Sequence, residues 1–453
     1  MSAGAGDGRR GLNVRAIVAW TLYDFANSAF AAVVLGTIYG AYYATAVVGN
    51  AHGEGDLWWG RVISTSMAIV AITSPFLGGL ADRAGIRRPL FIGFTALSVA
   101  ATALMSTVEP GLVVRGFVLG VIGNVGFEGA LVYYNAYLPE LAPRSHQGRV
   151  SGWGFAVGYA GSIVALLVAL PFVRAGDVPT AFLSTAALFA VFSLPAFLWL
   201  PPAPRARQSL WRAAWEGGAE LAATARRILA YRDLRRFLGA YFIYEDGVNT
   251  VVAFSGIFAA QTLGFPLGEL VVLYIVVQIS ALVGALAWSW PTDRIGPKRV
   301  VMITLLQWTL VVIAAWFVET RGQFYALAVA AGTGLGAVQA ANRAFLSTLI
   351  PRGMEAEIFG FFTLCGKSAA IMGPLVFGTI SHAAGGNQRA GILAIGAFFV
   401  VGLALLSRVK AGGPTHLPAP DPPSLDPPSP DPENAAVPPG GRIVAGGPAT
   451  GGQ

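Results

Sequence analysis

The feature that most constrains this chain is a series of long apolar segments separated by short polar links. Each segment reaches the ~20 residues that an α-helix needs to cross the hydrocarbon core of a bilayer. Open strands and loops leave backbone groups without hydrogen bonds in lipid, so segments of this length predict membrane-spanning helices. Twelve such segments are present, at residues 16–48, 57–80, 89–107, 111–138, 150–172, 179–200, 237–261, 268–290, 300–318, 322–350, 358–383 and 388–407.

Composition agrees with a multi-pass membrane protein and argues against other classes. Hydrophobic residues make up 55% of the 453 residues and charged residues 12%, about half of the ~25% that is usual in soluble domains. The only cysteine, Cys365, excludes a disulfide framework, and the four histidines are scattered. We therefore expect no metal, no cofactor and no enzymatic activity. The N-terminus lacks a small-residue cleavage site, so no removable signal peptide is expected.

The basic residues indicate the topology. Lysine and arginine gather in the N-terminal tail (1–15), in the central link (201–236) and in the loops on their side of the predicted membrane. The opposite loops hold only four basic residues, Arg61, Arg174, Arg321 and Arg389. By the positive-inside rule, both termini lie in the cytoplasm, and we expect a bacterial inner (plasma) membrane. This bias also explains the net charge of +7, so no nucleic-acid partner is predicted.

The central link divides the chain into two six-helix halves, residues 16–200 and 237–407. In the link, apolar residues recur near helical spacing between arginines, at Trp211, Trp215, Leu221, Ala225 and Leu229. This pattern fits an amphipathic helix on the anionic inner leaflet, with membrane lipids as partners, and fits a solvated linker helix equally well. The last residues, 408–453, are dominated by proline and glycine and predict a disordered cytoplasmic tail.

The two halves repeat one another. Asp24 to Ser28 matches Asp246 to Thr250, and the loop Gly78 to Arg88 matches Thr292 to Arg299, at a nearly constant offset. Two parallel repeats about an axis normal to the membrane are the architecture of major facilitator transporters. The predicted fold is therefore an all-α membrane protein with twelve transmembrane helices in two pseudo-symmetric halves.

Several motifs carry a more specific resemblance. The loop Gly78 to Arg88 resembles the Gly-x-Leu-Ala-Asp-Arg-x-Gly-Arg-Arg loop of the major facilitator superfamily, with Ile86 at one basic position. Five further motifs resemble the fungal autophagy-related vacuole effluxers and their bacterial relatives: Trp20 to Phe30, Tyr133 to Leu141, Gly148 to Gly158, Tyr241 to Thr250 and Ile358 to Pro374. The resemblance covers roughly residues 16–407. It implies export of amino acids in fungi, and implies no substrate for the bacterial branch.

Five charged residues interrupt the apolar segments at a similar depth. At ~1.5 Å per residue they lie roughly 12–16 Å from the cytoplasmic helix ends, near the middle of a ~30 Å hydrocarbon core. They are Asp24, Glu128, Asp246, Arg343 and Lys367. Each needs a partner or a water-filled cavity. A shared central cavity is the simplest explanation of their common depth.

Polar neighbours extend this candidate site for substrate and protons. They share helix faces with the charges or lie beside them, and they are Asn27, Asn124, Asn135, Glu245, Asn249 and Gln339. Glu128 is our preferred proton carrier. Asp24 and Asp246 could instead cap or bridge broken helices. Arg343 and Lys367 could neutralise Asp246 and Glu245, or hold a substrate carboxylate.

A second group of residues lies in the cytoplasmic loops. The resemblance implies that these loops latch one half against the other as gates. Their candidate residues are Gly78, Asp82, Arg83, Gly85, Arg87, Asp293, Arg294 and Gly296. For Arg87 we favour a simple positive-inside topology signal.

The sequence thus predicts a secondary transporter that works by alternating access. We expect a small polar solute, plausibly an amino acid or peptide, with efflux as the direction, proton coupling as a hypothesis and a monomer as the functional unit. A drug or metabolite exporter would need a mostly aromatic, weakly charged cavity. A non-transporting sensor or scaffold would use the tail and the basic link instead.

Overall fold

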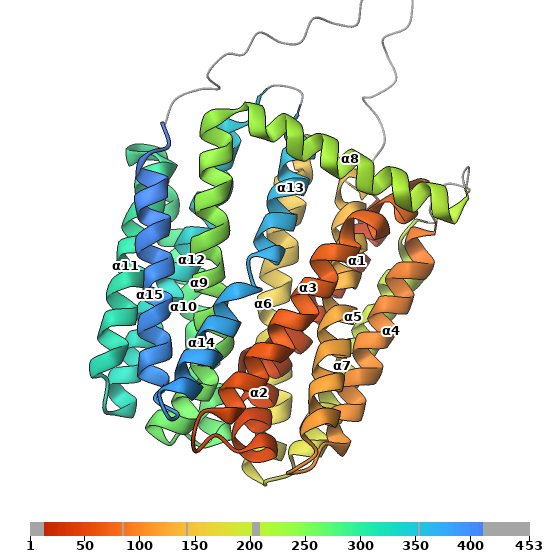
Figure 1. Cartoon of the computed structure of the whole chain (residues 1–453). Coiled ribbons are helices and arrows are strands. Elements are labelled where there is room, and N and C mark those ends of the chain that lie inside the picture. Colours follow the sequence, from red (N-terminus) through yellow and green to blue (C-terminus); the bar gives the residue numbers. More distant parts are fainter. Residues whose placement is uncertain (1–12, 84–85, 142–143, 202–208, 352–353, 411–453) are drawn as a thin grey trace, which may run out of the picture. The chain divides into compact units, whose positions relative to one another are not determined.

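The computed structural model describes residues 13–83, 86–141, 144–201, 209–351 and 354–410, all within one compact unit. Every element in these ranges is helical, which confirms the predicted fold class. The helices run side by side as a bundle (Figure 1). The predicted disordered tail from residue 411 onward and the N-terminal tail as far as residue 12 lie outside the described residues, whereas residues 408–410 of that tail are described.

The first half contains six long helical stretches. Their elements are α1 (Val14–Phe30), η1 (Ala31–Thr37), α2 (Ile38–Tyr42), η2 (Tyr43–Val48), α3 (Glu54–Arg83), α4 (Arg87–Leu104), η3 (Met105–Thr107), α5 (Val113–Leu141), α6 (Arg144–Arg174) and α7 (Val178–Trp199). The first four elements together form the first predicted segment.

The second half repeats this plan after a linking helix. Its elements, beginning with that linker, are α8 (Leu210–Ala230), α9 (Arg232–Leu263), α10 (Leu267–Ile295), α11 (Pro297–Phe317), α12 (Arg321–Leu349), α13 (Glu355–Ser368), α14 (Met372–Ala383) and α15 (Gln388–Ser407). The helix α8 crosses the end of the bundle at which α7 ends and α9 begins (Figure 1). We call this the α8 end and the opposite end the distal end.

Each of the twelve predicted segments coincides with helix. Within the described residues, ten helical stretches are long and apolar enough to cross a membrane. The long helices α3 and α9 run beside them in the bundle (Figure 1). A count of twelve spans is consistent with this arrangement, and the chain is an integral multi-pass membrane protein.

Two predicted segments are broken rather than continuous. In the first, π-helical turns at η1 and η2 flank the short helix α2, and Thr37 leaves the helical region with φ −139° and ψ −80°. In the eleventh, α13 ends at Ser368 and α14 begins at Met372. π-Helical turns are rare and are found mostly at functional sites. The break in the first segment is therefore a candidate functional region.

Candidate functional site

An ion pair joins the two halves in the middle of the bundle. Lys367 on α13 donates to Glu128 on α5, 239 residues away in the chain, and the two side chains are only 16% and 10% exposed. Of the two alternatives that the sequence left open for Lys367, this pairing matches neither, because the partner is Glu128 and not Asp246 or Glu245. Glu128 faces the opposite half, and the long lysine side chain reaches it there.

Asp246 caps a helix. Both carboxylate oxygens of this buried residue accept the backbone N–H of Gly373, each at 2.9 Å. Gly373 lies in the first turn of α14, where unpaired N–H groups and the helix dipole favour a negative charge. Asp246 therefore bridges the break between α13 and α14, which is the structural alternative that the sequence left open.

Asp24, the matching residue of the first half, makes different contacts. It accepts a long hydrogen bond of 3.5 Å from Asn27 on its own helix. The glycine face of α6 packs against it, because a methyl group added at Gly154 or Gly158 would lie 3.1–3.3 Å from an Asp24 carboxylate oxygen. The α6 glycines thus let that helix approach α1 closely at this carboxylate.

Longer-range electrostatic interactions cross the interface through Arg343. This arginine, on α12, interacts with Glu245 of its own half and with Tyr159 on α6 of the other half. Tyr159 in turn interacts with Asp24. The sequence did not single out Tyr159. It directly follows the motif Gly148 to Gly158, and this adjacency is the only sequence feature that could have pointed to Tyr159.

Glu245 and Arg343 differ in their exposure. Glu245 is buried, and its Oε2 atom has no hydrogen-bond partner in the described part of the chain. Arg343 is exposed, as are Gln339 and Ser347, four residues to either side on α12. These three residues share one helix face. A polar face that stays accessible beside a buried carboxylate is what a hydrophilic solute between the halves would require.

The remaining polar candidates fall into two groups. Asn124 is buried and donates to Ser66 on α3 at 2.6 Å. Asn342, which was not among the candidates but precedes Arg343 on α12, is also buried and accepts from Tyr244 at 2.7 Å. These contacts hold helices together. Asn135 is exposed and Asn249 is half-buried, so both remain available for a ligand.

The loop candidates are only partly described. Gly78, Asp82 and Arg83 belong to the end of α3, but their side chains lie outside the described residues, as does all of Gly85. Asp293 and Arg294 are exposed at the end of α10, with Arg294 stacked 4.0 Å above the Trp290 ring. Gly296 turns the chain into α11 with a positive φ of 89°.

Arg87, for which we favoured a positive-inside topology signal, also makes contacts within the first half. It is buried, forms an ion pair with Glu140 at 2.7 Å and lies over the Tyr137 ring at 5.0 Å. These contacts join α4 to α5 within the first half. Arg87 is thus a packing residue as well as a basic loop residue.

The halves are also joined at the distal end. Trp59 donates to the carbonyl of Ala253 at 3.1 Å. Nearer the middle of the bundle, Ser64 donates to the carbonyl of Ile371, in the break between α13 and α14, at 2.7 Å. Gly36 packs so tightly on Tyr274 of α10 that a methyl group added there would meet the ring at 2.5 Å. The first-segment break therefore lies at a close contact between the halves.

A buried carboxylate forms the centre of this distal contact. Asp56, in the first turn of α3, is fully buried and accepts from Asn50 and Gln388 at 2.8 Å and from Ser381 at 2.5 Å. Ser381 and Gln388 belong to the second half. We call Asn50, Asp56, Ser381 and Gln388 the distal latch. The sequence missed it, because Asp56 lies at the edge of an apolar segment.

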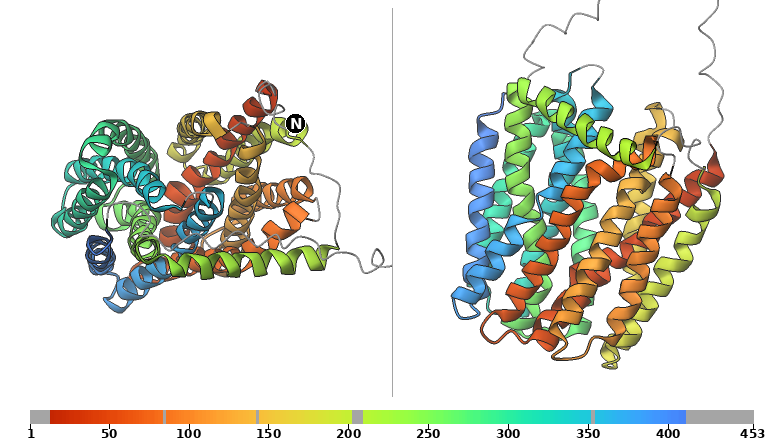
Figure 2. Two further views of the ribbon diagram at one scale, coloured as in Figure 1. Left: turned by 90° about the horizontal axis from the view of Figure 1, so that it is seen from above. Right: turned by 45° about the vertical axis from the view of Figure 1, so that its right-hand side comes forward.

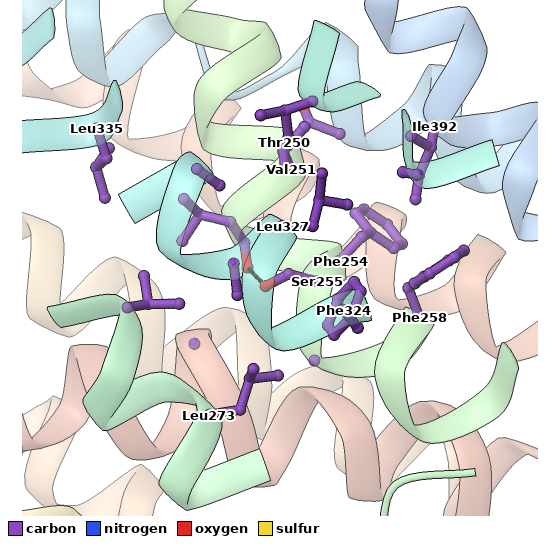
Figure 3. A pocket seen from close by; sticks show the side chains of 18 of the residues that line it. Thr250, Val251, Phe254, Ser255, Phe258, Leu273, Phe324, Leu327, Leu335 and Ile392 are labelled. Carbon is purple, nitrogen blue, oxygen red and sulfur yellow. Dashed lines mark hydrogen bonds between the residues drawn. The ribbon is translucent and has the colours of Figure 1, made fainter. Parts of the chain in front are cut away.

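An apolar cavity of about 80 Å³ lies apart from these charges (Figure 3). Its walls come mainly from the second half and include Phe254, Phe258, Leu273 and Phe324. Ser255 at its edge donates to the carbonyl of Val252 and so offers little to a polar ligand. The cavity suits an apolar group rather than a charged solute.

Comparison with known proteins gives one consistent result. The sequence profile of the family described as "Vacuole effluxer Atg22 like" matches residues 61–412. An uncharacterized MFS-type transporter, YxiO of Bacillus subtilis, is 28% identical over 86% of this chain and 94% of its own length. Autophagy-related protein 22 of Yarrowia lipolytica is 25% identical over 70% of this chain and 69% of its own length.

A solved structure shows the same fold. The crystal structure of a D-xylose–proton symporter superposes with a TM-score of 0.66 at 17% identity, covering 88% of this chain and 98% of that chain. At this identity the likeness concerns the fold alone. It confirms the major facilitator arrangement that the internal repeat predicted.

Proposed function

This chain belongs to the Atg22-like vacuole effluxer family, and its relative in Bacillus subtilis is named an MFS-type transporter. We therefore propose that this chain carries a small zwitterionic solute such as an amino acid across the membrane. Efflux is the proposed direction, with the halves rocking about a midplane site. We place both termini in the cytoplasm, the protein in a bacterial inner membrane and the transport unit in a monomer.

The observation that carries this proposal is the placement of opposite charges on both sides of the interface. Arg343 offers a planar guanidinium that binds a carboxylate in bidentate fashion. Glu245 interacts with Arg343 directly, and Asp24 is connected to it through Tyr159. These two carboxylates supply negative charge for an ammonium group. A solute with both charges would replace the interactions that cross the interface.

The contacts at the distal end support a transport cycle of alternating access. With the distal end closed by hydrogen bonds between the halves, a solute would reach Arg343 from the α8 end. Release on the distal side then requires those bonds to break while contacts at the α8 end form. The exposed Asp293 and Arg294 are candidates for the latter.

Proton coupling is the finer part of the proposal. In this proposal a proton replaces Lys367 as the partner of Glu128 during the cycle, and this change would release one half from the other at the site. The pair thus supplies a physical link between protonation and rocking. A carrier without coupling would keep the pair intact throughout the cycle.

A reconstituted protein tests the proposal. Liposomes containing a pH dye would receive pooled amino acids outside, with wild type compared with Glu128→Gln. We expect a proton flux that the pool triggers and that the variant loses. Substrate-driven flux that persists in the variant would exclude Glu128 as the carrier, and no flux with folded wild-type protein would exclude proton-coupled amino-acid transport.

An exporter of amphipathic molecules is the second candidate. The apolar cavity beside Phe254 and Phe324 favours it, because such molecules need an apolar surface. The same liposomes, loaded with a fluorescent amphipathic cation, separate the two. Efflux of the dye that Phe254→Ala abolishes and amino acids do not inhibit would favour this alternative.

A further inference from the structure

The linking helix α8 has one continuous exposed face. Residues at alternating spacings of three and four lie on a single side of a helix. On α8 this series is entirely exposed, and it consists of Arg212, Trp215, Ala219, Ala222, Arg226 and Leu229. Trp215 is 66% and Leu229 54% exposed. A tryptophan and a leucine with arginines beside them make an amphipathic strip rather than a water-solvated face.

The opposite face packs on the bundle. Thr224 and Ile228 are buried. At the edge of the exposed strip, Gly218 lies against Phe76 of α3, where an added methyl group would meet the ring at 3.1 Å. The backbone of α8 is therefore seated on the side of α3. Its exposed strip points away from the protein.

The contact with Phe76 places α8 at the depth of the membrane interface. Phe76 precedes Arg83, the last residue of α3, by roughly 10 Å at ~1.5 Å per residue. Interfacial helices insert about 5–10 Å at the boundary of headgroups and acyl chains. Phe76 and Ile72 are themselves 39% and 69% exposed, as expected for the lipid-facing side of α3.

The view along the bundle agrees with this depth. From above, α8 runs along the edge of the helices, not across their centre (Figure 2, left). From the side it slopes along the flank at the α8 end (Figure 2, right). A helix at the edge meets lipid, whereas one across the centre would cover the route to the site.

We propose that α8 is an in-plane interfacial helix that binds anionic phospholipid headgroups. Trp215 and Leu229 enter the acyl boundary, and Arg212 and Arg226, each three residues before one of them, bind phosphate groups. Arg212 is 75% exposed although it pairs with Glu216 at 3.2 Å, so it can reach a headgroup. The basic side of the protein faces the leaflet in which anionic lipids prevail.

The first test measures the depth of the exposed strip. In a Cys365→Ser background, a spin label at Ala222→Cys would be compared in liposomes with labels at Ala175→Cys, in an exposed turn, and Val191→Cys, on the exposed side of α7. We expect oxygen to relax the Ala222 label as it does the Val191 label. Preferential relaxation by a water-soluble nickel complex, as at Ala175, would identify a solvated linker and overturn the proposal.

The second test addresses charge. The preference of the protein for spin-labelled phosphatidylglycerol over phosphatidylcholine would be measured for wild type and two double variants. The first double variant carries Arg212→Gln and Arg226→Gln on α8. The second, the matched control, carries Arg61→Gln and Arg115→Gln at the distal end. We expect the α8 pair to reduce the preference for phosphatidylglycerol at least about twofold, and the distal pair to leave it nearly unchanged. Equal preference in the α8 variant and wild type would show that the arginines do not select anionic lipid.

Discussion

At the scale of single residues, the pair of Glu128 and Lys367 combines two roles that mutation can separate. Removing one partner of a buried ion pair costs roughly 3–5 kcal/mol, because the other charge remains uncompensated. Removing both avoids that penalty. Stability and transport should therefore respond differently to single and double changes.

We predict that Glu128→Gln and Lys367→Met each lower the unfolding temperature, and that the double variant recovers most of the loss. In a double-mutant cycle, the double variant should therefore lose clearly less stability than the two single variants together. Thermal unfolding in detergent measures stability, and liposome flux measures transport. We expect transport to stay at least about tenfold reduced in the double variant. Additive losses of stability would show that the pair does not form.

The sequence predicted which residues carry charge at this level but not how they pair. Depth follows from counting residues along a helix, so Glu128, Arg343 and Lys367 could be assigned to one layer. Which charged residues pair depends on the rotation and separation of helices from different halves. Local sequence patterns do not predict these quantities. For the same reason Tyr159 was not identified, since a tyrosine in an apolar segment resembles a packing residue.

At the scale of helices, Asp246 illustrates a carboxylate that stabilises a break. The sequence predicted one span over residues 358–383 because its apolar character is continuous. The break between α13 and α14 depends on a cap from another helix. From the sequence, capping a broken helix was therefore one possible role of Asp246, but it could not be distinguished from a role in transport.

For this cap we predict a graded effect. Asp246→Ala should destabilise the protein by about 0.5–2 kcal/mol, the usual effect of losing an N-cap, and Asp246→Asn by less, because its amide oxygen still accepts from Gly373. Chemical or thermal unfolding in detergent measures both. Asp177→Ala, which removes the exposed cap of α7 that accepts from Thr180 at 3.1 Å, is the matched control. An equal loss for Asn and Ala would contradict the assigned contact.

The close approach of α1 and α6 yields another prediction at this scale. A methyl group added at Gly161 would lie 2.2 Å from the carbonyl oxygen of Phe25, which is backbone and cannot rotate away. Gly161→Ala should therefore destabilise the protein by about 1–3 kcal/mol through overpacking. Gly239→Ala on α9, where nothing lies within 4 Å, should be neutral or stabilising because alanine favours helix. Similar unfolding temperatures for the two variants would argue against the helix contact.

At the scale of the whole molecule, the distal latch holds the two halves together at one end. The overall plan of two similar halves could be predicted, because the repeat lies in the sequence itself. Which end is closed could not be predicted, because a transporter sequence must encode both closures and a structure displays one.

We predict that Asp56→Ala shifts the protein towards opening at the distal end. The substitution removes the acceptor that Asn50, Ser381 and Gln388 share. In a Cys365→Ser background, a cysteine at Ala253, whose carbonyl accepts from Trp59, should react at least about tenfold faster with a membrane-impermeant maleimide. Asp177→Ala, in an exposed turn, should leave the rate unchanged. An unchanged rate in Asp56→Ala would show that the latch does not control access.

The separation of Glu128 and Lys367 along the chain also has a consequence for biosynthesis. Translation at ~5–20 residues per second takes roughly 10–50 s to pass from one residue to the other, a distance of 239 residues. During that interval, the first half resides in the membrane with a mid-bilayer glutamate whose lysine does not yet exist. At this stage we expect Glu128 to need water or another polar group in place of Lys367. Intermediates truncated before and after α13 should therefore differ in their resistance to membrane-protein quality control.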